Sequence, residues 1–514
     1  MTRSEGALPT VTAMVSGTAK RTTKRKHTHK MLWVFVFVLY GLTRLTALDS
    51  LPLHNDEGLH LTRAVEVWNL HPFWEIRDGK IINHWAIAVF YPQNAPVFIG
   101  RFPTVLIGMI GVAAGIAVLY RLFGQTAAAF GALLWIASPY LFFYERMAFS
   151  DAEAGAWAIL ALWLALRLAH RSTIPRAILT GAALGVAALF KFTAIPYILC
   201  VLLLVLNGRA PLRQRFRDLI IIGGVVAVLF SIPIGYLLLR GGDVFSIALN
   251  WVGSDGSTQI GVNFERLWAQ LTGFGTLIWT AAVLGGLLLL LIMRSERGAF
   301  MLIVIGVPLM TMILWGKDVQ SRHYVVMLPG LFLLGGAGIG LGLDRWLRSL
   351  TARRIVGISA VALLLIGLIP FAQTAYTNPQ ALTLPPLMQM QYLTDHPAGF
   401  GLREAVEAFP TTTDDDTPII GSLFGDSCRR ANFYAVDGRR MDCPDAPGVP
   451  EIEAALDAHG SVYVLVESES IIGADVRQIE NADAVEIARY PRPGETFETA
   501  SVVLWRLDRL ELLN

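Results

Sequence analysis

Charged side chains are scarce in this sequence. Asp, Glu, Lys and Arg make up 16% of its 514 residues, whereas hydrophobic residues make up 54%. The mean hydropathy is +0.52, and the apolar residues are gathered in long runs. This composition excludes a typical soluble globular protein and predicts a polytopic membrane protein.

Cysteine is also rare, with three residues in the whole chain. Cys200 lies in an apolar run, where a thiol usually acts as a small packed side chain. Cys428 and Cys443 lie in the more polar C-terminal part, and they could form a disulfide if that part faces an oxidising compartment. The sequence gives no geometry for such a bridge, so the pairing stays open. Neither of these two cysteines has the ligand spacing of a zinc site.

The sequence shows no internal repeat and no removable signal peptide. The first apolar run is long enough for a membrane span and lacks a small-residue cleavage site, so it predicts an anchor. The basic tail before it, residues 1–30, is expected to be disordered. A helix needs about 20 apolar residues to cross the hydrocarbon core, and on that criterion we predict about eleven transmembrane helices. They lie near residues 31–48, 101–123, 126–143, 152–169, 177–190, 193–208, 219–239, 269–293, 299–315, 323–342 and 354–371.

Basic residues lie on one side of these predicted spans. The N-terminal tail is rich in Lys and Arg, and the positive-inside rule places it in the cytoplasm. Alternation from there also places the basic loops inside, at Arg121 and at residues 170–176, 209–217, 294–297 and 345–354. The segments left outside are 49–100, 144–151, the surroundings of Lys191, 240–268, 316–322 and everything after 371. They carry carboxylates, aromatic residues, His and Asn, so we expect the chemistry on the outer face of the plasma membrane.

The C-terminal part has the composition of a soluble domain. Strand-like runs occur at 418–421, 462–466 and 500–505, and a helix-like stretch lies at 452–458. The predicted fold is therefore an all-α polytopic membrane domain over 31–371, followed by a small α/β extracytoplasmic domain over 372–514.

The first outer segment begins with the acidic stretch His54-Asn55-Asp56-Glu57. Apolar residues at helical spacing follow it and predict an amphipathic helix at the membrane surface. In the structural interpretation, Asn55 caps this helix and the two acids complement its dipole. In the functional interpretation, a carboxylate pair desolvated against the bilayer has a raised pKa and suits a general base. The alternative role of divalent-metal ligand falls on His54, Asp56, Glu57 and His60.

A second acidic position, Asp151, lies just before an apolar span in the stretch Arg146-Met-Ala-Phe-Ser-Asp151. Ionisable residues at the edge of a membrane core are costly and usually paired or functional. The alternative is that Ser150 or Asp151 caps the following helix, with Arg146 as a salt-bridge partner.

These two acidic stretches, the segment 181–193 and Ser321-Arg322-His323-Tyr324 followed by Met327-Leu328-Pro329 together resemble GT-C glycosyltransferases. The resemblance is strongest to the dolichyl-phosphate-mannose protein mannosyltransferases and the lipid A aminoarabinose transferases. It covers roughly residues 31–345. It implies a GT-C fold with interfacial helices in the first outer loop.

The resemblance also implies roles for individual residues. Asp56 falls on the catalytic base and Glu57 beside it shapes the site, whereas Asp151 matches a second acid that organises the acceptor or a metal. Lys191 and Arg322 match the cations that bind the lipid phosphate. The usual Arg-Tyr pair is split here, so either His323 or Tyr324 takes the place of the tyrosine. Further candidates for contact with the phosphate or the acceptor are Arg146, Arg77, Lys80 and His84.

The chemistry of a polyprenyl-phosphate sugar agrees with these roles. The leaving group gains negative charge, which fixed cations such as Arg322 would stabilise. The acceptor hydroxyl loses a proton, which Asp56 could take, and a single displacement inverts the anomeric centre. The alternatives are that Lys191 only snorkels from a helix end, and that Lys317 and its neighbours pair with Asp318 or lipid headgroups. The phosphate donor has no pyrophosphate that would demand a metal.

The predicted function is therefore transfer of a sugar from a polyprenyl-phosphate-linked donor to a protein, lipid or glycan acceptor. Two rival functions stay open: a flippase or transporter of lipid-linked sugars, and a non-catalytic protein of an envelope complex. A transporter places ionisable residues near the bilayer midplane and often has repeated halves, whereas this sequence gathers them at one face. No nucleic-acid partner is expected.

Overall fold

The structure is a computed structural model of the whole chain. It describes residues 26–510 except 74–79, 92–95, 242–258, 275–276, 294, 318, 348, 424–426, 437, 446–447, 468–475 and 480. The chain divides into two compact units, which we describe separately. The first comprises residues 1–48, 71–86 and 101–376, and the second comprises 49–70, 87–100 and 377–514.

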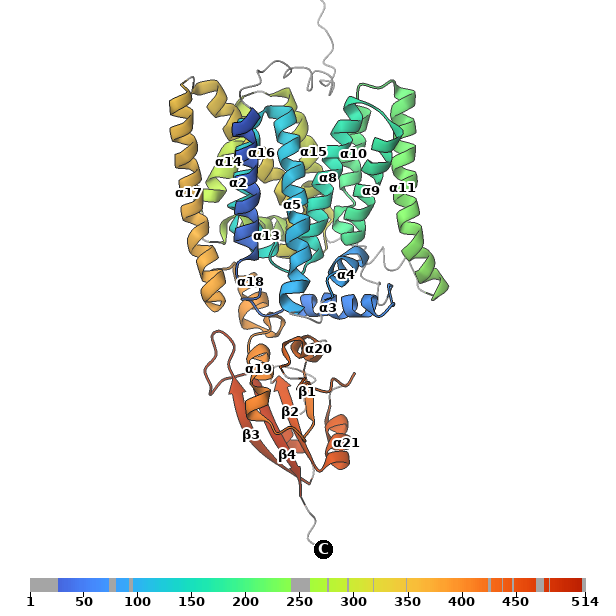
Figure 1. The fold of residues 1–514 in the computed structure, drawn as a ribbon, viewed down its shortest axis with the longest axis vertical. Helices are drawn as coiled ribbons and strands as arrows, with labels where there is room; N and C mark the ends of the chain where they lie inside the picture. Colours follow the sequence, from blue (N-terminus) through green and yellow to red (C-terminus); the bar gives the residue numbers. More distant parts are fainter. Residues whose placement is uncertain are drawn as a thin grey trace, which may run out of the picture. The chain divides into compact units, whose positions relative to one another are not determined.

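The first unit is a bundle of apolar helices that run side by side (Figure 1). Its helices are α2 (Lys26–Leu45), α5 (Pro96–Phe123), α6 (Gln125–Ile136), α7 (Pro139–Tyr144), α8 (Ser150–His170), α9 (Ile174–Phe190), α10 (Tyr197–Leu206), α11 (Leu212–Leu239), α13 (Ile260–Thr272), α14 (Leu277–Ile292), α15 (Glu296–Trp315), α16 (Leu328–Trp346) and α17 (Leu350–Thr377), with the ends of α5 and α17 reaching into the second unit. Each apolar run of the sequence coincides with at least one of them.

Several of these helices are long and apolar enough to cross a membrane. Among the described residues, five qualify by length and composition: Pro96–Phe123, Ser150–His170, Leu212–Leu239, Glu296–Trp315 and Thr351–Thr377. The pair Ile260–Thr272 and Leu277–Ile292 brings the number to six if it forms one broken span. Four further apolar helices are shorter. The chain is thus a multi-pass membrane protein, and the count of eleven crossings stays a prediction.

Two predicted spans are broken by proline. The run 126–143 divides into α6 and α7, because Ser138 caps α7 by accepting a hydrogen bond from the Leu141 amide (3.2 Å) and Pro139 starts the new helix. The run 193–208 begins with a short 3-10 turn, η3 (Phe192–Ala194), and α10 starts only after Pro196. Both breaks shorten helices that composition alone would draw as continuous.

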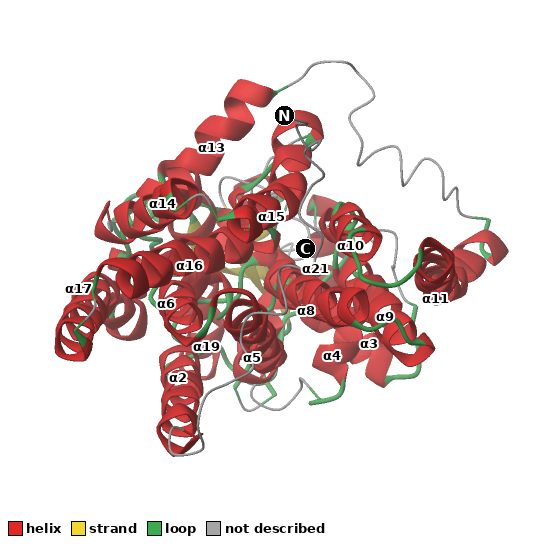
Figure 2. Cartoon of the chain, turned by 90° about the horizontal axis from the view of Figure 1, so that it is seen from above, coloured by secondary structure: helices red, strands yellow, loops and turns green. Residues whose placement is uncertain are grey.

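Glycines of α16 allow close helix packing in the centre of the bundle. Helix α16 contacts both α6 and α14 (Figure 2). A Cβ atom at Gly336 would overlap the backbone of Gly131 in α6, and one at Gly338 would overlap the backbone of Gly286 in α14. Small residues at such crossings are a common way to bring helices together in a membrane, where lipid gives little hydrophobic drive.

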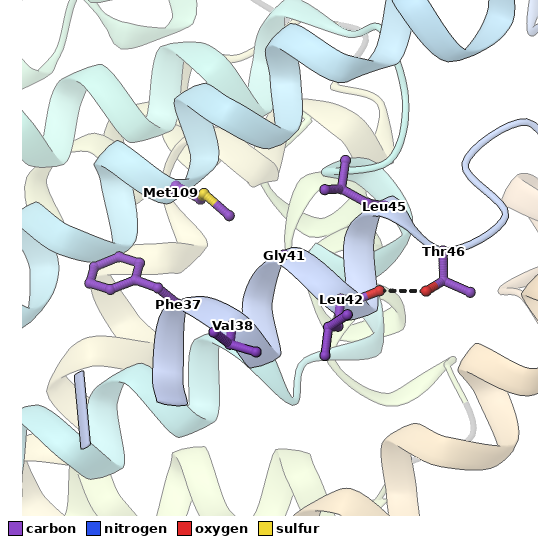
Figure 3. Close-up of a pocket in the computed structure, with 7 residues that line it drawn as sticks. All are labelled: Phe37, Val38, Gly41, Leu42, Leu45, Thr46 and Met109. Carbon is purple, nitrogen blue, oxygen red and sulfur yellow. Dashed lines mark hydrogen bonds between the residues drawn. The ribbon is translucent and has the colours of Figure 1, made fainter. Parts of the chain in front are cut away.

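An open groove of about 540 Å³ lies along α2 and is shown in Figure 3. Its lining is apolar, with Phe37, Val38, Leu42 and Met109 among the side chains. The hydroxyl of Thr46 in the lining donates to the Leu42 carbonyl (2.7 Å). The groove has no titratable side chain, so it cannot supply acid–base chemistry.

The C-terminal part of the second unit contains a four-stranded sheet, with strands β1 (Ile419–Ser422), β2 (Ser461–Glu467), β3 (Ala482–Tyr490) and β4 (Val502–Arg509). The strand order is β1-β2-β4-β3; β1 and β2 are parallel, and the other pairs are antiparallel. Helices α19 (Leu402–Thr412) and α21 (Val449–His459) contribute to two hydrophobic clusters that include residues of the sheet. The three predicted strands and the predicted helix are present, but β3 is an additional strand.

Cys428 and Cys443 form a disulfide, with their Cα atoms 5.7 Å apart. Cys428 lies in the short helix α20 (Ser427–Ala431), and both residues pack in the cluster around Phe409 and Leu465. The third cysteine, Cys200, is buried in the first unit. Its thiol donates to the Val304 carbonyl (2.9 Å), as a packed thiol would.

We expect thiol labelling to report this pairing. In protein purified without reductant and then denatured, only the Cys200 thiol should react with a maleimide, whereas all three thiols should react after reduction. The double variant Cys428→Ala/Cys443→Ala should lose about 2–4 kcal/mol of stability, because a bridge over a short loop restricts the unfolded chain. Cys200→Ala serves as the control. Labelling of all three thiols without reductant would contradict the pairing.

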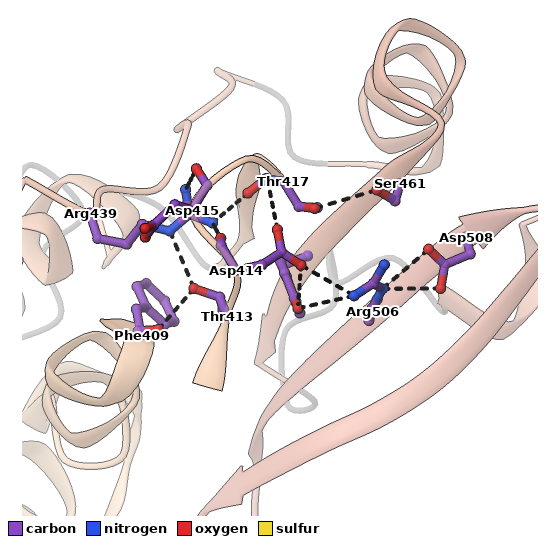
Figure 4. A network of polar contacts seen from close by, with 10 residues as sticks. Phe409, Thr413, Asp414, Asp415, Thr417, Arg439, Ser461, Arg506 and Asp508 are labelled. Atoms are coloured by element: carbon purple, nitrogen blue, oxygen red, sulfur yellow. Dashed lines mark hydrogen bonds and ion pairs between the residues drawn. The ribbon is translucent and has the colours of Figure 1, made fainter. Parts of the chain in front are cut away.

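A surface network joins Asp414 to β2 and β4 (Figure 4). The Thr417 amide donates to Asp414 (2.9 Å), the Tyr463 hydroxyl donates to it (3.1 Å), and Arg506 forms an ion pair with it (3.2 Å). A hydrogen bond from the Thr417 side chain is the main cause that holds the pKa of Asp414 below its ordinary value, with the Thr417 amide, Tyr463 and Arg506 contributing.

This lowered pKa gives stability that is present above the unfolded pKa of about 4 and is lost as the pH falls through the folded pKa. We therefore expect Asp414→Asn to lower the thermal stability of the full-length protein at pH 7, by less than about 1 kcal/mol because the network is exposed. As the pH falls below the folded pKa of Asp414, the variant and the wild type should converge. Asp416→Asn, at an exposed carboxyl nearby, is the control, and equal losses for both variants would contradict the role of Asp414.

Candidate active site

A buried ion pair lies at the N-terminal end of α8 in the first unit. The Lys191 ammonium is 2.6 Å from the Asp151 carboxylate, and the two side chains are 4% and 2% exposed. Asp151 is in the first turn of α8, and Lys191 directly follows α9, which packs along α8. Burial of either charge alone would be very costly, so each stabilises the other in place. The predicted acid and the predicted phosphate-binding lysine are therefore in contact.

Further cations lie around this pair. The charges of Arg322 and Lys80 both act on the Lys191 ammonium. The Arg322 guanidinium also stacks over the ring of Phe149, with 5.4 Å to the ring centre. Asp151 thus pairs with Lys191, and the charges of two further segments act on that lysine. Such a set suits an anionic ligand with several oxygen acceptors, because charge-assisted hydrogen bonds are the strongest in proteins.

Tyrosine hydroxyls hold the segment that carries Arg322. This segment is the 3-10 helix η4 (Ser321–Val326). Tyr140 donates to the Ser321 carbonyl (2.6 Å), and Tyr144 shares a hydrogen bond with the Ser321 hydroxyl (2.6 Å). At the other end of η4, Tyr197 donates to the Val326 carbonyl (3.0 Å). The backbone beside Arg322 is therefore anchored by α7 and α10, a feature that the sequence analysis did not identify.

The two candidates that follow Arg322 have different surroundings. Tyr324 is buried, and its hydroxyl donates to the Asn263 carbonyl of α13 (2.5 Å). His323 is partly exposed, and its Nδ1 atom accepts from the Gln320 amide (3.2 Å) in a capping box. Tyr324 thus fixes η4 to α13, and His323 is the more accessible of the two.

Glu153 is a buried carboxyl that received no role in the sequence analysis. It accepts hydrogen bonds from Asn83 of α4 (Ile81–Ala88; 2.7 Å) and from Thr104 of α5 (3.2 Å). Glu153 lies in the first turn of α8, close enough to Asp151 for the two carboxyl groups to interact electrostatically. Asn83 and Thr104 are both far from Glu153 in the sequence. The only sequence feature that could have marked Glu153 as a site residue is its position two residues after Asp151.

Arg146 makes contacts that hold the loop after α2. Its guanidinium donates to the carbonyls of Arg44 (3.0 Å), Thr46 (2.5 Å) and Ala47 (2.5 Å). Next to it, Arg44 forms a buried ion pair with Glu145 (2.9 Å). The alternative interpretation, a cap of α8 by Ser150 or Asp151, is wrong, because Phe149 occupies the N-cap position and no side chain caps the helix.

In the second unit, the acidic stretch begins helix α3 (Asn55–Trp68), as the periodicity predicted. The capping residue is His54 and not Asn55. The His54 Nδ1 atom accepts from the Asp56 amide (3.1 Å), and the Glu57 carboxylate accepts from the His54 amide (3.0 Å). Glu57 is fully buried in this capping box, whereas Asp56 is partly exposed.

The candidates for a metal centre do not come together. His54, Asp56, Glu57 and His60 all lie in the described part of the chain, where no group of three or more His, Cys, Asp or Glu side chains is placed to hold a metal ion. His60 and His84 are both buried. Arg77 and Asp318 fall outside the described residues.

Comparison with known proteins gives the following relatives. A family model described as dolichyl-phosphate-mannose-protein mannosyltransferase matches residues 81–236. No curated protein matches the chain. The structure of ArnT from Cupriavidus metallidurans in the apo state has a TM-score of 0.62 at 15% identity, covering 93% of this chain and 98% of that one. The same protein bound to undecaprenyl phosphate gives 0.59 at 16% identity, covering 94% and 98%.

A more distant similarity is to the oligosaccharyltransferase AglB from Archaeoglobus fulgidus in complex with an inhibitory peptide and a dolichol-phosphate. Its TM-score is 0.50 at 10% identity, covering 87% of this chain and 70% of that one. The structural matches establish a shared fold. Together with the family match, they confirm the resemblance drawn from the sequence.

We expect the Asp151–Lys191 pair to respond to removal of one partner. Lys191→Met leaves the carboxylate buried without this cation and should cost about 3–5 kcal/mol of stability. Asp151→Asn in the same chain should recover much of that loss, but it should not recover a function that needs the cation. The measurement is thermal unfolding in detergent. Lys317→Met, in the loop before η4, is the control, and additive losses in the double variant would contradict the coupling.

Proposed function

We propose that this chain, a membrane glycosyltransferase of the GT-C type, transfers a sugar from a polyprenyl-phosphate-linked donor to an acceptor hydroxyl on the extracytoplasmic face. The observation that carries this proposal is the buried Asp151–Lys191 pair at the start of α8, where the charges of Arg322 and Lys80 act on Lys191. The match to a mannosyltransferase family and the fold shared with a protein that binds undecaprenyl phosphate support the same donor class.

The cation set would bind the phosphate of the donor. When the bond between the anomeric carbon and the phosphate oxygen breaks, negative charge grows on the phosphate. Cations already fixed in a site from which water is largely excluded stabilise that charge without reorganisation. Arg322 suits this role because its backbone is anchored through Ser321 and Val326.

Asp56 would be the general base. Glu57 accepts the His54 amide within the capping box and is fully buried, so its carboxylate is already used for structure. Asp56 is partly exposed at the start of α3. It can take the proton of the attacking hydroxyl, and the single displacement inverts the anomeric centre. Asp151, held by Lys191, would orient the lysine and help to place the acceptor.

The membrane topology is part of the proposal. The basic tail and the basic loops place the N-terminus in the cytoplasm, and an odd number of crossings then brings Asp56, Asp151 and Arg322 to the outer face. The C-terminal part would lie on the same side, in agreement with the disulfide between Cys428 and Cys443. The acceptor would be a protein, a lipid or a glycan of that compartment.

A comparison of envelopes tests this function. Mass spectrometry of envelope lipids, glycans and glycoproteins from cells with and without the gene should reveal one missing sugar, which defines donor and acceptor class. Cells that carry Asp56→Asn should also lack that sugar, with transfer reduced about 10²–10⁴-fold, because the base is lost. Glu66→Gln, a carboxyl on the same helix, is the matched control. Full transfer by Asp56→Asn at normal protein levels would contradict the proposal.

A further inference from the structure

The C-terminal part of the chain holds the backbone just before the proposed base. Both main-chain groups of Leu53 are bound by it: the amide donates to the Tyr434 hydroxyl (2.5 Å), and the carbonyl accepts from the Arg430 guanidinium (3.1 Å). Leu53 immediately precedes His54, the cap of α3. These contacts lie within the second unit, which includes residues 49–70 and 377–514.

Arg430 makes more contacts than an ordinary surface arginine. It is 1% exposed, and its guanidinium also donates to the carbonyls of Pro397 (2.6 Å) and His396 (3.1 Å) and to the Ser427 hydroxyl (3.1 Å). A rigid fork of donors is needed to satisfy acceptors in several directions, and lysine lacks that geometry.

Gly58 brings the first turn of α3 against the same arginine. A Cβ atom at Gly58 would lie 2.5 Å from the Cβ of Arg430 and 2.6 Å from its Cγ, so only glycine permits this approach. The Arg430 charge also acts on Glu57. The turn that contains Asp56 is thus fixed from two directions, through the backbone at Leu53 and through packing at Gly58.

We propose that Arg430 and Tyr434 are positioning residues for Asp56, so that the C-terminal part of the chain sets the geometry of proton removal from the acceptor. This inference rests on the proposed function, in which Asp56 is the general base. It predicts that a change at Arg430, 377 residues from Leu53 in the sequence, acts on the chemistry and not only on folding.

The test measures sugar transfer in membrane vesicles, which contain the endogenous donor and acceptor, at equal amounts of full-length protein. Arg430→Gln should reduce the rate about 10- to 100-fold, because a displacement of about 1 Å is enough for such a loss. Tyr434→Phe removes one hydrogen bond and should cost less. Arg429→Gln is the matched control, because the guanidinium of this neighbouring residue is exposed and forms a surface ion pair with Asp445.

The deciding measurement combines these changes with Asp56→Asn. If Arg430 and Tyr434 act through Asp56, they should cause no further loss of the residual rate once the base is absent. Losses that multiply in the double variants would overturn the positioning role while leaving the base intact. An unchanged rate in Asp56→Asn alone would instead refute the proposed base. If Arg430→Gln does not accumulate in the membrane, Tyr434→Phe decides by the same comparison.

Discussion

The cost of burying charge among apolar helices governs the arrangement of the first unit. Two carboxylates near the start of α8 are ionic partners of buried cations: Asp151 with Lys191, and Glu145 with Arg44. Removal of either charge from such a pair leaves the other buried without a partner, which is costly. The pairs therefore fix the end of α8 against the segment after α9 and against the end of α2. Placement of a reactive group and stability of the bundle then depend on the same contacts.

Tyrosine hydroxyl groups fix the segment η4 in the bundle. The segment η4 is too short to be stable by itself, yet Tyr140, Tyr144 and Tyr197 bind its backbone or its first side chain from neighbouring helices. Glycines of α16 let the helices around it approach closely. The backbone on either side of Arg322 is thereby held by hydroxyl groups. The charge of Arg322 acts on Lys191.

The sequence predicted those features that local pattern determines. Apolar runs located the helices, helical spacing located α3, and an acid at the edge of a span marked Asp151 as a functional candidate. The role of Lys191 came from the family resemblance. What it missed depends on contacts between distant segments. Glu153 is recognised as a site residue through its hydrogen bonds with Asn83 and Thr104. Arg430 is recognised through its hydrogen bond to the Leu53 carbonyl. Strand β3 was missed because its residues alternate between half-buried and exposed and include Ala, Asp, Glu and Arg, so no apolar run marks it.

The cap of α3 shows why residue type alone could not separate structure from chemistry. Asn55 is the better capping residue by type, but the chain uses His54, and the Glu57 carboxylate closes the box. One carboxylate of the acidic pair therefore serves the helix, and the other remains partly exposed.

The charge balance of the proposed phosphate site also bears on how strongly it would bind the donor and the leaving phosphate. A polyprenyl-phosphate sugar is a phosphodiester with one negative charge, whereas the departing lipid phosphate is a monoester that approaches two negative charges near neutral pH. The cations Lys191, Arg322 and Lys80 outnumber the two neighbouring carboxyl groups, Asp151 and Glu153. In the proposed reaction, such a set would interact more strongly with the leaving phosphate than with the intact donor, so its binding energy would grow as the bond breaks. The same preference would slow release of the lipid phosphate from the site. If sugar transfer is fast, this release would then limit the rate of turnover.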